Sequence, residues 1–208
     1  MSDLEIIAGL LLAIMLTLIL GVLILSRNLH ILGRKSALDT TSENYSLLKI
    51  NNFPEIIVGA GTVLTRPQVK EAKQSGALFG LAPGFDIEII PEADKFNFPF
   101  IPGIATPSEI QSALKYNLNL LKFFPAEFLG GIDYLKSISA PFIQENLKFI
   151  PLGGIDFDSA ENYLNSRLIL AIGGSWIANN HLIENCDWKE IENRANLVCQ
   201  LIRKTKEN

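Results

Sequence analysis

Residues 120–127 read LLKFFPAE, a short apolar run that holds one lysine, Lys122, and breaks at Pro125. Runs of this kind recur from residue 55 onward at a loose period of about 21 residues, which indicates a repeated structural unit. The other five runs are EIIVGAGTVL (55–64), LFGLAPG (78–84), FPFIPGIAT (98–106), KFIPLGGI (148–155) and LILAIGGSW (168–176). Continuous apolar runs that lead into glycine or proline are typical of strands buried on both faces of a parallel sheet.

Helix start signals lie between these runs. The clearest is TPSEIQSALKYN at 106–117, in which Thr106 is expected to cap a helix, Pro107 to take its first position and Glu109 to complete a capping box. The same logic predicts helix caps at Thr65, Asp158 and Asp187. Strands that alternate with capped helices indicate consecutive βα units.

This alternation predicts an α/β fold, and we expect a (β/α)8 TIM-type barrel. Barrel phosphate sites form where strands seven and eight end. The last two runs end in GG at 153–154 and in GGS at 173–175, where bare backbone N–H groups can approach an anion. The six runs would then be strands three to eight, and residues 1–54 would have to supply the first two βα units. A doubly wound open sheet is the alternative, but VGAGTV at 58–63 lacks the third glycine of the phosphate turn typical of that fold.

Lys122 is the candidate catalytic residue. A lysine that faces into a barrel near the end of a strand lies at the active-site mouth, where desolvation disfavours the charged amine and lowers its pKa. A neutral amine can attack a ketone to form a Schiff base, and the protonated imine can then accept electrons from a neighbouring C–C bond. Two other readings remain open: Lys122 extends into water at the barrel mouth, or it pairs with Glu127.

Composition excludes several classes of function. The net charge of −4 and the pI near 5.3 give no basic surface for nucleic acid. Cys186 and Cys199 match no metal-binding spacing and suit a reducing compartment, and His30 and His181 are too few for a histidine metal centre. We therefore expect no metal site and no nucleic-acid partner.

From about residue 53 to residue 202 the chain resembles the 2-keto-3-deoxy-6-phosphogluconate (KDPG) aldolases, also called 4-hydroxy-2-oxoglutarate (KHG) aldolases. The segments that carry the resemblance are FPEIIVGAGTVL, APG, IPGIATPSE, LKFFPAE, GGI and IGGSW. The resemblance implies a class I aldolase on a (β/α)8 barrel, a cytoplasmic homotrimer that splits the phosphorylated keto acid into pyruvate and glyceraldehyde 3-phosphate. It implies no metal or organic cofactor, because the imine itself accepts the electrons.

The resemblance also implies roles for individual residues. Lys122 would be the Schiff-base lysine, Thr62 would hold the pyruvate part of the substrate, and Pro83 and Phe124 would line the pocket. The phosphate group would be bound by Gly153, Gly154, Gly174 and Ser175. Ordinary structural readings stand beside these roles: Thr62 and Ser175 as helix or turn caps, Pro83 as loop punctuation and Phe124 as core.

The chain departs from the family pattern in two places. Leu152 stands where the family's TGGI segment has a threonine, which removes a hydroxyl near the substrate. The family's second strand carries a LEVTLR-like segment, whose glutamate moves protons and whose arginine binds the substrate carboxylate, and this chain has no such segment. We therefore expect a domain at 53–208 that forms the barrel but is impaired as an aldolase.

The segment 1–52 is atypical. Residues 6–25 contain no charge and would span about 30 Å as a helix, the thickness of a bilayer core. Basic residues follow this stretch, which would keep the aldolase domain on the inner face of the membrane. Three interpretations remain open: a membrane anchor that replaces the barrel start, a buried barrel element, or a frameshift near the start of the gene.

Two functional alternatives also remain open. The first is an aldolase for the epimeric substrate 2-keto-3-deoxy-6-phosphogalactonate, because the pocket motifs do not report the configuration of one hydroxyl. The second is a catalytically inactive, membrane-tethered barrel that binds phosphorylated ligands. A carboxylate close to Lys122 would favour an enzyme over a binding protein.

We predict that the full-length chain is membrane-associated or aggregates on expression, because residues 6–25 expose too much apolar surface for a soluble tail. Fractionation followed by extraction with alkaline carbonate measures this. A chain that remains wholly soluble and monodisperse would favour the buried barrel element instead.

Overall fold

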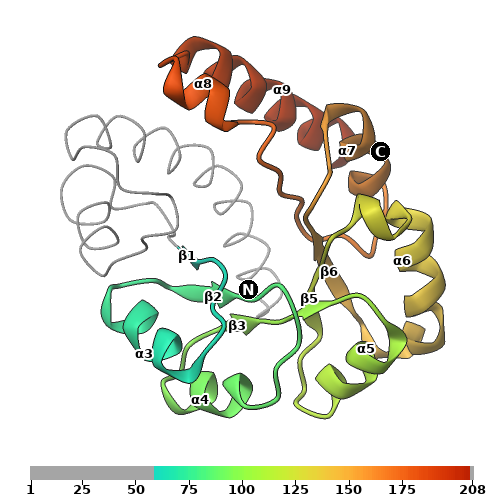
Figure 1. Ribbon diagram of the computed structural model, residues 1–208. Coiled ribbons are helices and arrows are strands. Elements are labelled where there is room, and N and C mark those ends of the chain that lie inside the picture. Colours follow the sequence, from blue (N-terminus) through green and yellow to red (C-terminus); the bar gives the residue numbers. More distant parts are fainter. Residues whose placement is uncertain (1–58, 207–208) are drawn as a thin grey trace. The chain divides into compact units, whose positions relative to one another are not determined.

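The computed structural model describes residues 59–206, in which parallel strands alternate with helices (Figure 1). This part of the chain falls into two compact units, one of residues 59–73 and 78–174, the other of 74–77 and 175–206. The expected apolar helix at 6–25 and the first two βα units lie outside the described residues. Among residues 59–206, no helix is both long enough and apolar enough to cross a bilayer.

The first unit contains short strands that pair only in parallel. They are β1 (Gly59–Ala60), β2 (Phe79–Leu81), β3 (Phe100–Ile101), β4 (Gly103–Ile104), β5 (Leu120–Phe123) and β6 (Lys148–Pro151). They form one sheet of order β1-β2-β3 and another of order β4-β5-β6. The last apolar run adds a parallel bridge between Ile169 and Phe149. All six apolar runs therefore take part in parallel pairing, and their place as strands three to eight of a closed barrel stays a prediction.

The paired segments are shorter than the apolar runs that predicted them. Pro102 separates β3 from β4, because a proline has no N–H to donate to a neighbouring strand. Its carbonyl oxygen still accepts a 2.8 Å hydrogen bond from the N–H of Lys122. The pairing thus passes from one sheet to the other within a single run of the sequence.

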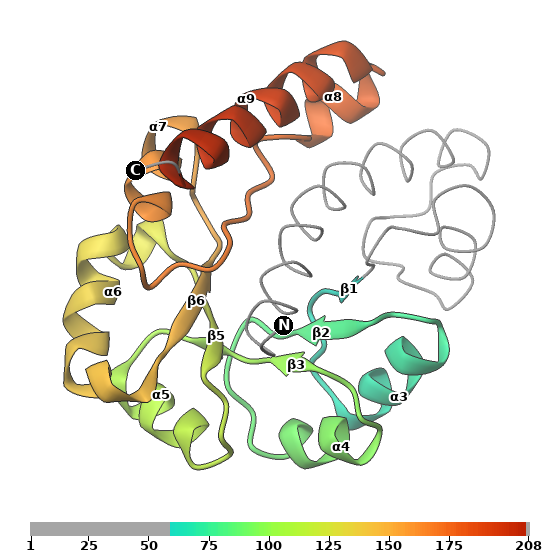
Figure 2. The ribbon, with the colours of Figure 1, turned by 180° about the vertical axis from the view of Figure 1, so that it is seen from behind.

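Helices follow the strands in the order expected of βα units. They are α3 (Arg66–Gln74), α4 (Ile89–Lys95), α5 (Pro107–Leu114), α6 (Gly131–Ser139) and α7 (Phe157–Leu164), with 3-10 turns at Glu127–Leu129 and Ala140–Glu145. Seen from behind, α4, α5 and α6 lie outside the strands (Figure 2).

The predicted helix starts are confirmed in most cases. Thr106 and Glu109 form the expected capping box at α5, with Pro107 in its first turn. At α3 the hydroxyl of Thr65 accepts the N–H of Gln68 at 3.4 Å. The prediction for α7 was wrong, because the cap is Asp156, whose carboxylate accepts the N–H of Ser159 at 2.9 Å. Asp156 has the extended backbone that a cap requires, whereas Asp158 lies inside the first turn.

The core of the first unit lies between the strands and the helices. Leu121 and Phe123 on β5 and Phe149 on β6 are fully buried, and the ring of Phe123 stacks on that of Tyr134 from α6 at 6.2 Å between centroids. Side chains alternate between the two faces of a strand. Lys122 therefore lies on the face of β5 that is turned away from α6.

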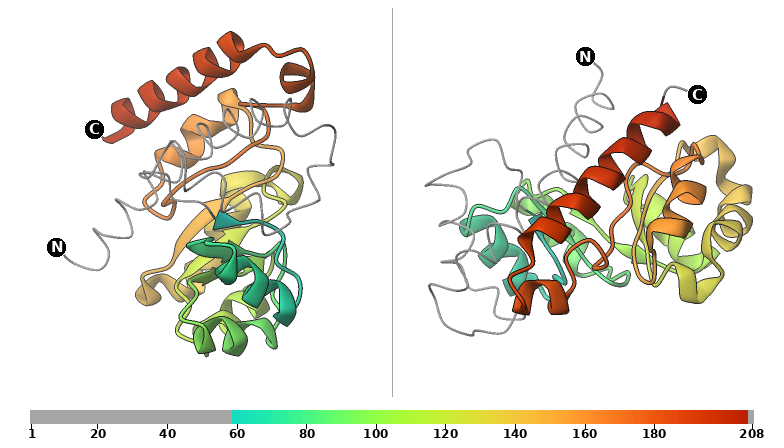
Figure 3. Two further views of the ribbon diagram at one scale, coloured as in Figure 1. Left: turned by 90° about the vertical axis from the view of Figure 1, so that its left-hand side faces the viewer. Right: turned by 90° about the horizontal axis from the view of Figure 1, so that it is seen from above.

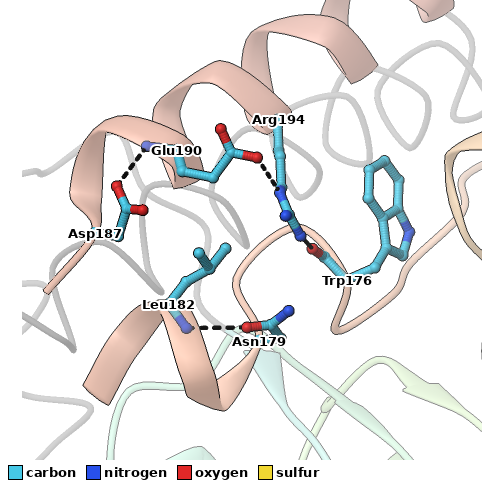
Figure 4. A network of polar contacts seen from close by, with 6 residues as sticks. All are labelled: Trp176, Asn179, Leu182, Asp187, Glu190 and Arg194. Carbon is cyan, nitrogen blue, oxygen red and sulfur yellow. Dashed lines mark hydrogen bonds and ion pairs between the residues drawn. The ribbon is translucent and has the colours of Figure 1, made fainter. Parts of the chain in front are cut away.

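The second unit contains α8 (Asn180–Glu184) and the long helix α9 (Trp188–Lys206), drawn at the red end of the colour bar in Figure 3. Asp187 caps α9 as predicted, by accepting the N–H of Glu190 at 3.1 Å. Figure 4 shows how Arg194 then joins two parts of this unit: its Nε donates to Glu190 and its Nη1 to the carbonyl oxygen of Trp176, both at 2.7 Å. The guanidinium group thereby anchors the segment that follows Ser175 to α9.

Candidate active site

Lys122 lies at the centre of β5 and is nearly enclosed, with 9% of its surface exposed. Its register partners on the two neighbouring strands are Gly103 and Ile150. A β-carbon at Gly103 would overlap the carbonyl group of Pro83, so only glycine allows the segment after β2 to cross β4 this closely. The absence of a side chain at Gly103 therefore brings Pro83 to the strand beside Lys122.

The surroundings of the Lys122 amine are apolar. Its Nζ atom lies 4.5 Å from the centre of the Phe124 ring. Burial lowers the pKa of this amine from its ordinary value of 10.5, because desolvation penalises the charged form. Within residues 59–206, no carboxylate forms an ion pair with Lys122. A deprotonated amine is consequently available over a wider range of pH than on an exposed lysine.

The two alternative interpretations of Lys122, exposure to water and pairing with Glu127, do not hold in the structure. The burial of the side chain leaves little room for an amine that extends into water. Pairing with Glu127 is also wrong, because Glu127 accepts a hydrogen bond from the hydroxyl of Tyr163 at 2.5 Å. Lys122 is thus a buried amine without an opposite charge among the described residues.

Phe124 connects the lysine to the glycine turn after β6. A β-carbon at Gly153 would lie 3.1 Å from the ring of Phe124 and 3.0 Å from the Cα atom of Pro125. Gly153 and Gly154 both have left-handed backbones, with φ of 97° and 84°. The structure therefore brings together Lys122, Phe124 and the first half of the expected phosphate site.

This glycine turn has the donors that an anion requires. Within residues 59–206, the N–H groups of Gly153 and Gly154 donate to no protein acceptor, and neither does the N–H of Gly174. Free N–H groups in successive turn residues form concave sites that favour anions. Ser175 belongs to the second compact unit and is exposed, so its part in a shared phosphate site stays a prediction.

Leu152 has an apolar side chain at the position where the family pattern has the hydroxyl of a threonine. A β-carbon at Gly173 would lie 3.1 Å from Cδ2 of Leu152, so this side chain covers the α-carbon of Gly173. The N–H of Gly173 donates to the carbonyl oxygen of Pro151 at 3.3 Å. The side chain of Leu152 therefore lies against Gly173 in the last apolar run.

Thr62 is exposed just after β1 and has a φ of 58°. Its reading as the cap of α3 is wrong, because Thr65 and Gln68 make the capping contacts of that helix. A β-branched residue with a left-handed backbone is rare and costs free energy, and such outliers gather at functional sites. The outlier supports a binding role for Thr62, although no pattern in the sequence predicted this backbone conformation.

The structure also contains features that sequence reasoning missed. The contact between Tyr163 and Glu127 joins residues that are far apart in the chain, and no spacing or motif pointed to it.

A hollow of about 700 Å³ is lined by Phe85, Asp86, Ile87, Ser112, Lys115 and Tyr116, none of which is an expected site residue. The chemistry of a buried amine and free N–H groups, rather than the position of this hollow, identifies the candidate site. Within the described part of the chain, no group of acidic, histidine and cysteine side chains could hold a metal ion.

Comparison with known proteins shows which family this chain is similar to. The family model described as KDPG and KHG aldolase matches residues 37–194. A 2-dehydro-3-deoxy-phosphogluconate aldolase of Haemophilus influenzae is 37% identical over 165 residues, which cover 79% of this chain and 76% of that protein. The KHG/KDPG aldolase of Escherichia coli is 41% identical over 142 residues, which cover 68% of this chain and 66% of that protein.

Solved structures show the same likeness. A KDPG aldolase from Legionella pneumophila, with pyruvate captured as a covalent carbinolamine, aligns with a TM-score of 0.69 and 39% identity over 74% of this chain and 73% of that one. The KDPG aldolase of Zymomonas mobilis with 3-phosphoglycerate aligns with a TM-score of 0.63 and 33% identity, over 72% of each chain.

We expect Lys122→Met to raise the Tm by roughly 2–4 °C, the shift that about 1 kcal/mol produces in a chain of this size. The cause is that a charged amine is costly to bury, whereas a thioether of similar length is not. Because the folded-state pKa is lowered, the cost is full below that pKa and disappears as pH rises toward 10.5. The advantage of the variant should therefore shrink with rising pH, as measured by thermal unfolding at several pH values.

Lys136→Met is the matched control. Lys136 is 54% exposed on α6 and pairs with Asp133 at the surface. Such pairs contribute about 0–1 kcal/mol, so its Tm should change little. A Lys122→Met variant that is less stable than the wild type at neutral pH would show that the amine has a stabilising partner.

Proposed function

The chain belongs to the KDPG and KHG aldolase family, and we propose that it cleaves KDPG into pyruvate and glyceraldehyde 3-phosphate through a Schiff base on Lys122. The observation that supports this proposal most directly is the buried amine of Lys122, whose pKa is lowered by desolvation. A relative from Legionella pneumophila with a covalent carbinolamine of pyruvate supports the same chemistry.

The proposed reaction begins with attack of the neutral amine on the C2 ketone. The carbinolamine takes up a proton, loses water and becomes a protonated imine, which draws electrons from the C3–C4 bond. As that bond breaks, the C4 hydroxyl loses its proton and glyceraldehyde 3-phosphate leaves. The remaining enamine takes up a proton at C3, and water then releases pyruvate and regenerates the amine. The proposal needs no metal or organic cofactor, because the imine accepts the electron pair.

Substrate binding is proposed to involve residues on both sides of Lys122. Thr62 would hold the pyruvate part, while Pro83 and Phe124 would line the pocket. The phosphate would bind the free N–H groups of Gly153, Gly154 and Gly174, together with Ser175. The relative from Zymomonas mobilis that holds 3-phosphoglycerate is consistent with a phosphorylated ligand.

Proton transfer is the step in which we propose that this chain is impaired. The family's second-strand glutamate and arginine have no counterpart in the sequence, and no carboxylate among residues 59–206 pairs with Lys122. We therefore expect this chain to form the imine on Lys122 but to turn over KDPG slowly. We further propose that the chain folds as a (β/α)8 barrel and forms a homotrimer in the cytoplasm. Analytical ultracentrifugation of the purified chain would test the trimeric state.

We predict that Lys122 forms an imine with pyruvate. Incubation with pyruvate and borohydride, followed by mass spectrometry, should show one reduced adduct, and Lys122→Arg should show none. The trapping rate should rise with pH and level off below the ordinary lysine pKa of 10.5, because burial favours the neutral amine. A wild-type chain that forms no adduct at any pH, or an adduct that persists in Lys122→Arg, would refute the assignment.

We predict that turnover of KDPG is roughly 10²–10⁴-fold slower than that of the KHG/KDPG aldolase of Escherichia coli, the factor that general acid–base catalysis typically supplies. Release of pyruvate, coupled to NADH oxidation by lactate dehydrogenase, measures both enzymes side by side. Equal rates would mean that another carboxylate transfers the proton, and substitution of Asp39 and Glu43 would locate it. The same assay with the phosphogalactonate epimer separates the two aldolase specificities, and a chain that binds phosphate but cleaves neither epimer is a binding protein.

A further inference from the structure

The turn between β6 and α7 is built in a way that costs conformational entropy. Gly153 and Gly154 follow each other with left-handed φ values of 97° and 84°. Glycine loses more backbone freedom on ordering than any other residue. A turn of two glycines presents a defined set of N–H groups only if its neighbours hold it in place.

The segment after β5 holds this turn. The N–H of Ala126 donates to the carbonyl oxygen of Leu152 at 2.8 Å, and the N–H of Glu127 donates to that of Gly153 at 3.0 Å. A β-carbon at Gly154 would lie 2.8 Å from the Cβ atom of Glu127, so the stem of that side chain lies directly against the turn. The backbone and the side chain of Glu127 therefore both contact the glycine pair.

The carboxylate of Glu127 points away from the turn. It accepts the hydroxyl of Tyr163 at 2.5 Å, and a β-carbon at Gly131 would lie 3.6 Å from its Oε1 atom. Gly131 is the first residue of α6, where the helix dipole favours negative charge. The stem of Glu127 thus contacts Gly154, while its carboxylate lies beside Tyr163 and the start of α6.

Tyr163 is the residue that donates the hydrogen bond to the Glu127 carboxylate. It lies on α7, the helix into which the turn leads, and only 1% of its surface is exposed. Burial, together with the hydrogen bond and the charge of Glu127, raises its pKa above the ordinary value of 10.0, so its hydroxyl stays a donor. One hydrogen bond therefore connects α7, which follows the glycine turn, to the segment after β5, which lies against that turn.

We propose that Tyr163 is a positioning residue that, through Glu127, holds the Gly153–Gly154 turn in the geometry that binds a phosphate group. This inference rests on the proposed function, to which it adds the cause of selectivity for phosphorylated ligands. Tyr163 itself touches neither the phosphate nor Lys122. Removal of its hydroxyl frees the Glu127 carboxylate, and the turn loses its fixed shape.

The test uses Tyr163→Phe in the full chain, with inorganic phosphate as the probe. The dissociation constant of phosphate, measured by calorimetry, should rise roughly tenfold, as expected for a hydrogen bond to a charged group. Trapping of pyruvate by borohydride should be unchanged, because pyruvate carries no phosphate. Where turnover is measurable, the KM for KDPG should rise while that for the unphosphorylated KHG stays constant.

Two variants control for the loss of a tyrosine hydroxyl and of a charge. Tyr134 on α6 also donates its hydroxyl, to the carbonyl oxygen of Ala105 at 2.9 Å, and Tyr134→Phe should leave phosphate affinity unchanged. Glu127→Gln keeps an oxygen that accepts from Tyr163 and should retain most of the affinity, whereas Glu127→Ala should lose as much as Tyr163→Phe. The double variant Tyr163→Phe with Glu127→Ala should lose no more than either single one, because the two residues act as one unit.

Several results would overturn the inference: unchanged phosphate affinity in both Tyr163→Phe and Glu127→Ala, an equal loss in Tyr134→Phe, or a parallel loss of pyruvate trapping. Should Tyr163→Phe fail to fold, Glu127→Ala decides the question, because Glu127 is only half-buried. A wild-type chain that traps no pyruvate but binds phosphate would refute the proposed Schiff base alone. A wild-type chain that traps pyruvate but binds no phosphate would refute the positioning role.

Discussion

The amine of Lys122 is buried beside the ring of Phe124, on a strand whose other face forms the core. Leu121 and Phe123 are fully buried against the helix side, so alternation along β5 leaves Lys122 no choice of face. Desolvation then makes the neutral amine more favourable, which is what a nucleophile at neutral pH requires. The same apolar packing that stabilises the strand thereby lowers the pKa of the lysine within it.

Close approaches between backbones build the remainder of the site around this lysine. Gly103 lets the Pro83 segment cross β4, and Gly153 lets the turn after β6 rest against Phe124. These glycines provide space but no rigidity. Within the first unit, the hydrogen bond from Tyr163 to Glu127 joins α7 to the segment after β5. In the second unit, the bonds of Arg194 to Glu190 and Trp176 join the segment after Ser175 to α9 (Figure 4). Both contacts join segments that are far apart in the sequence.

Features that depend on a few neighbouring residues could be predicted from the sequence. The caps at Thr106 and Asp187 are examples, because the side chain and the N–H group that it accepts are three residues apart. The cap of α7 was misplaced from Asp156 to Asp158, because its position depends on the path of the chain out of the glycine turn. The left-handed backbone of Thr62 was missed for a similar reason, since no local preference of threonine favours it.

The sequence by itself determined that apolar runs alternate with helices in a parallel α/β fold, and that one lysine lies within such a run. Both follow from the order and spacing of apolar residues, which are properties of the chain before it folds. Only the tertiary structure decided that Lys122 has no carboxylate partner among the described residues, and that Glu127 turns to Tyr163 instead. A pairing between residues 36 positions apart depends on how α7 packs against the segment after β5, and no spacing along the chain encodes that contact.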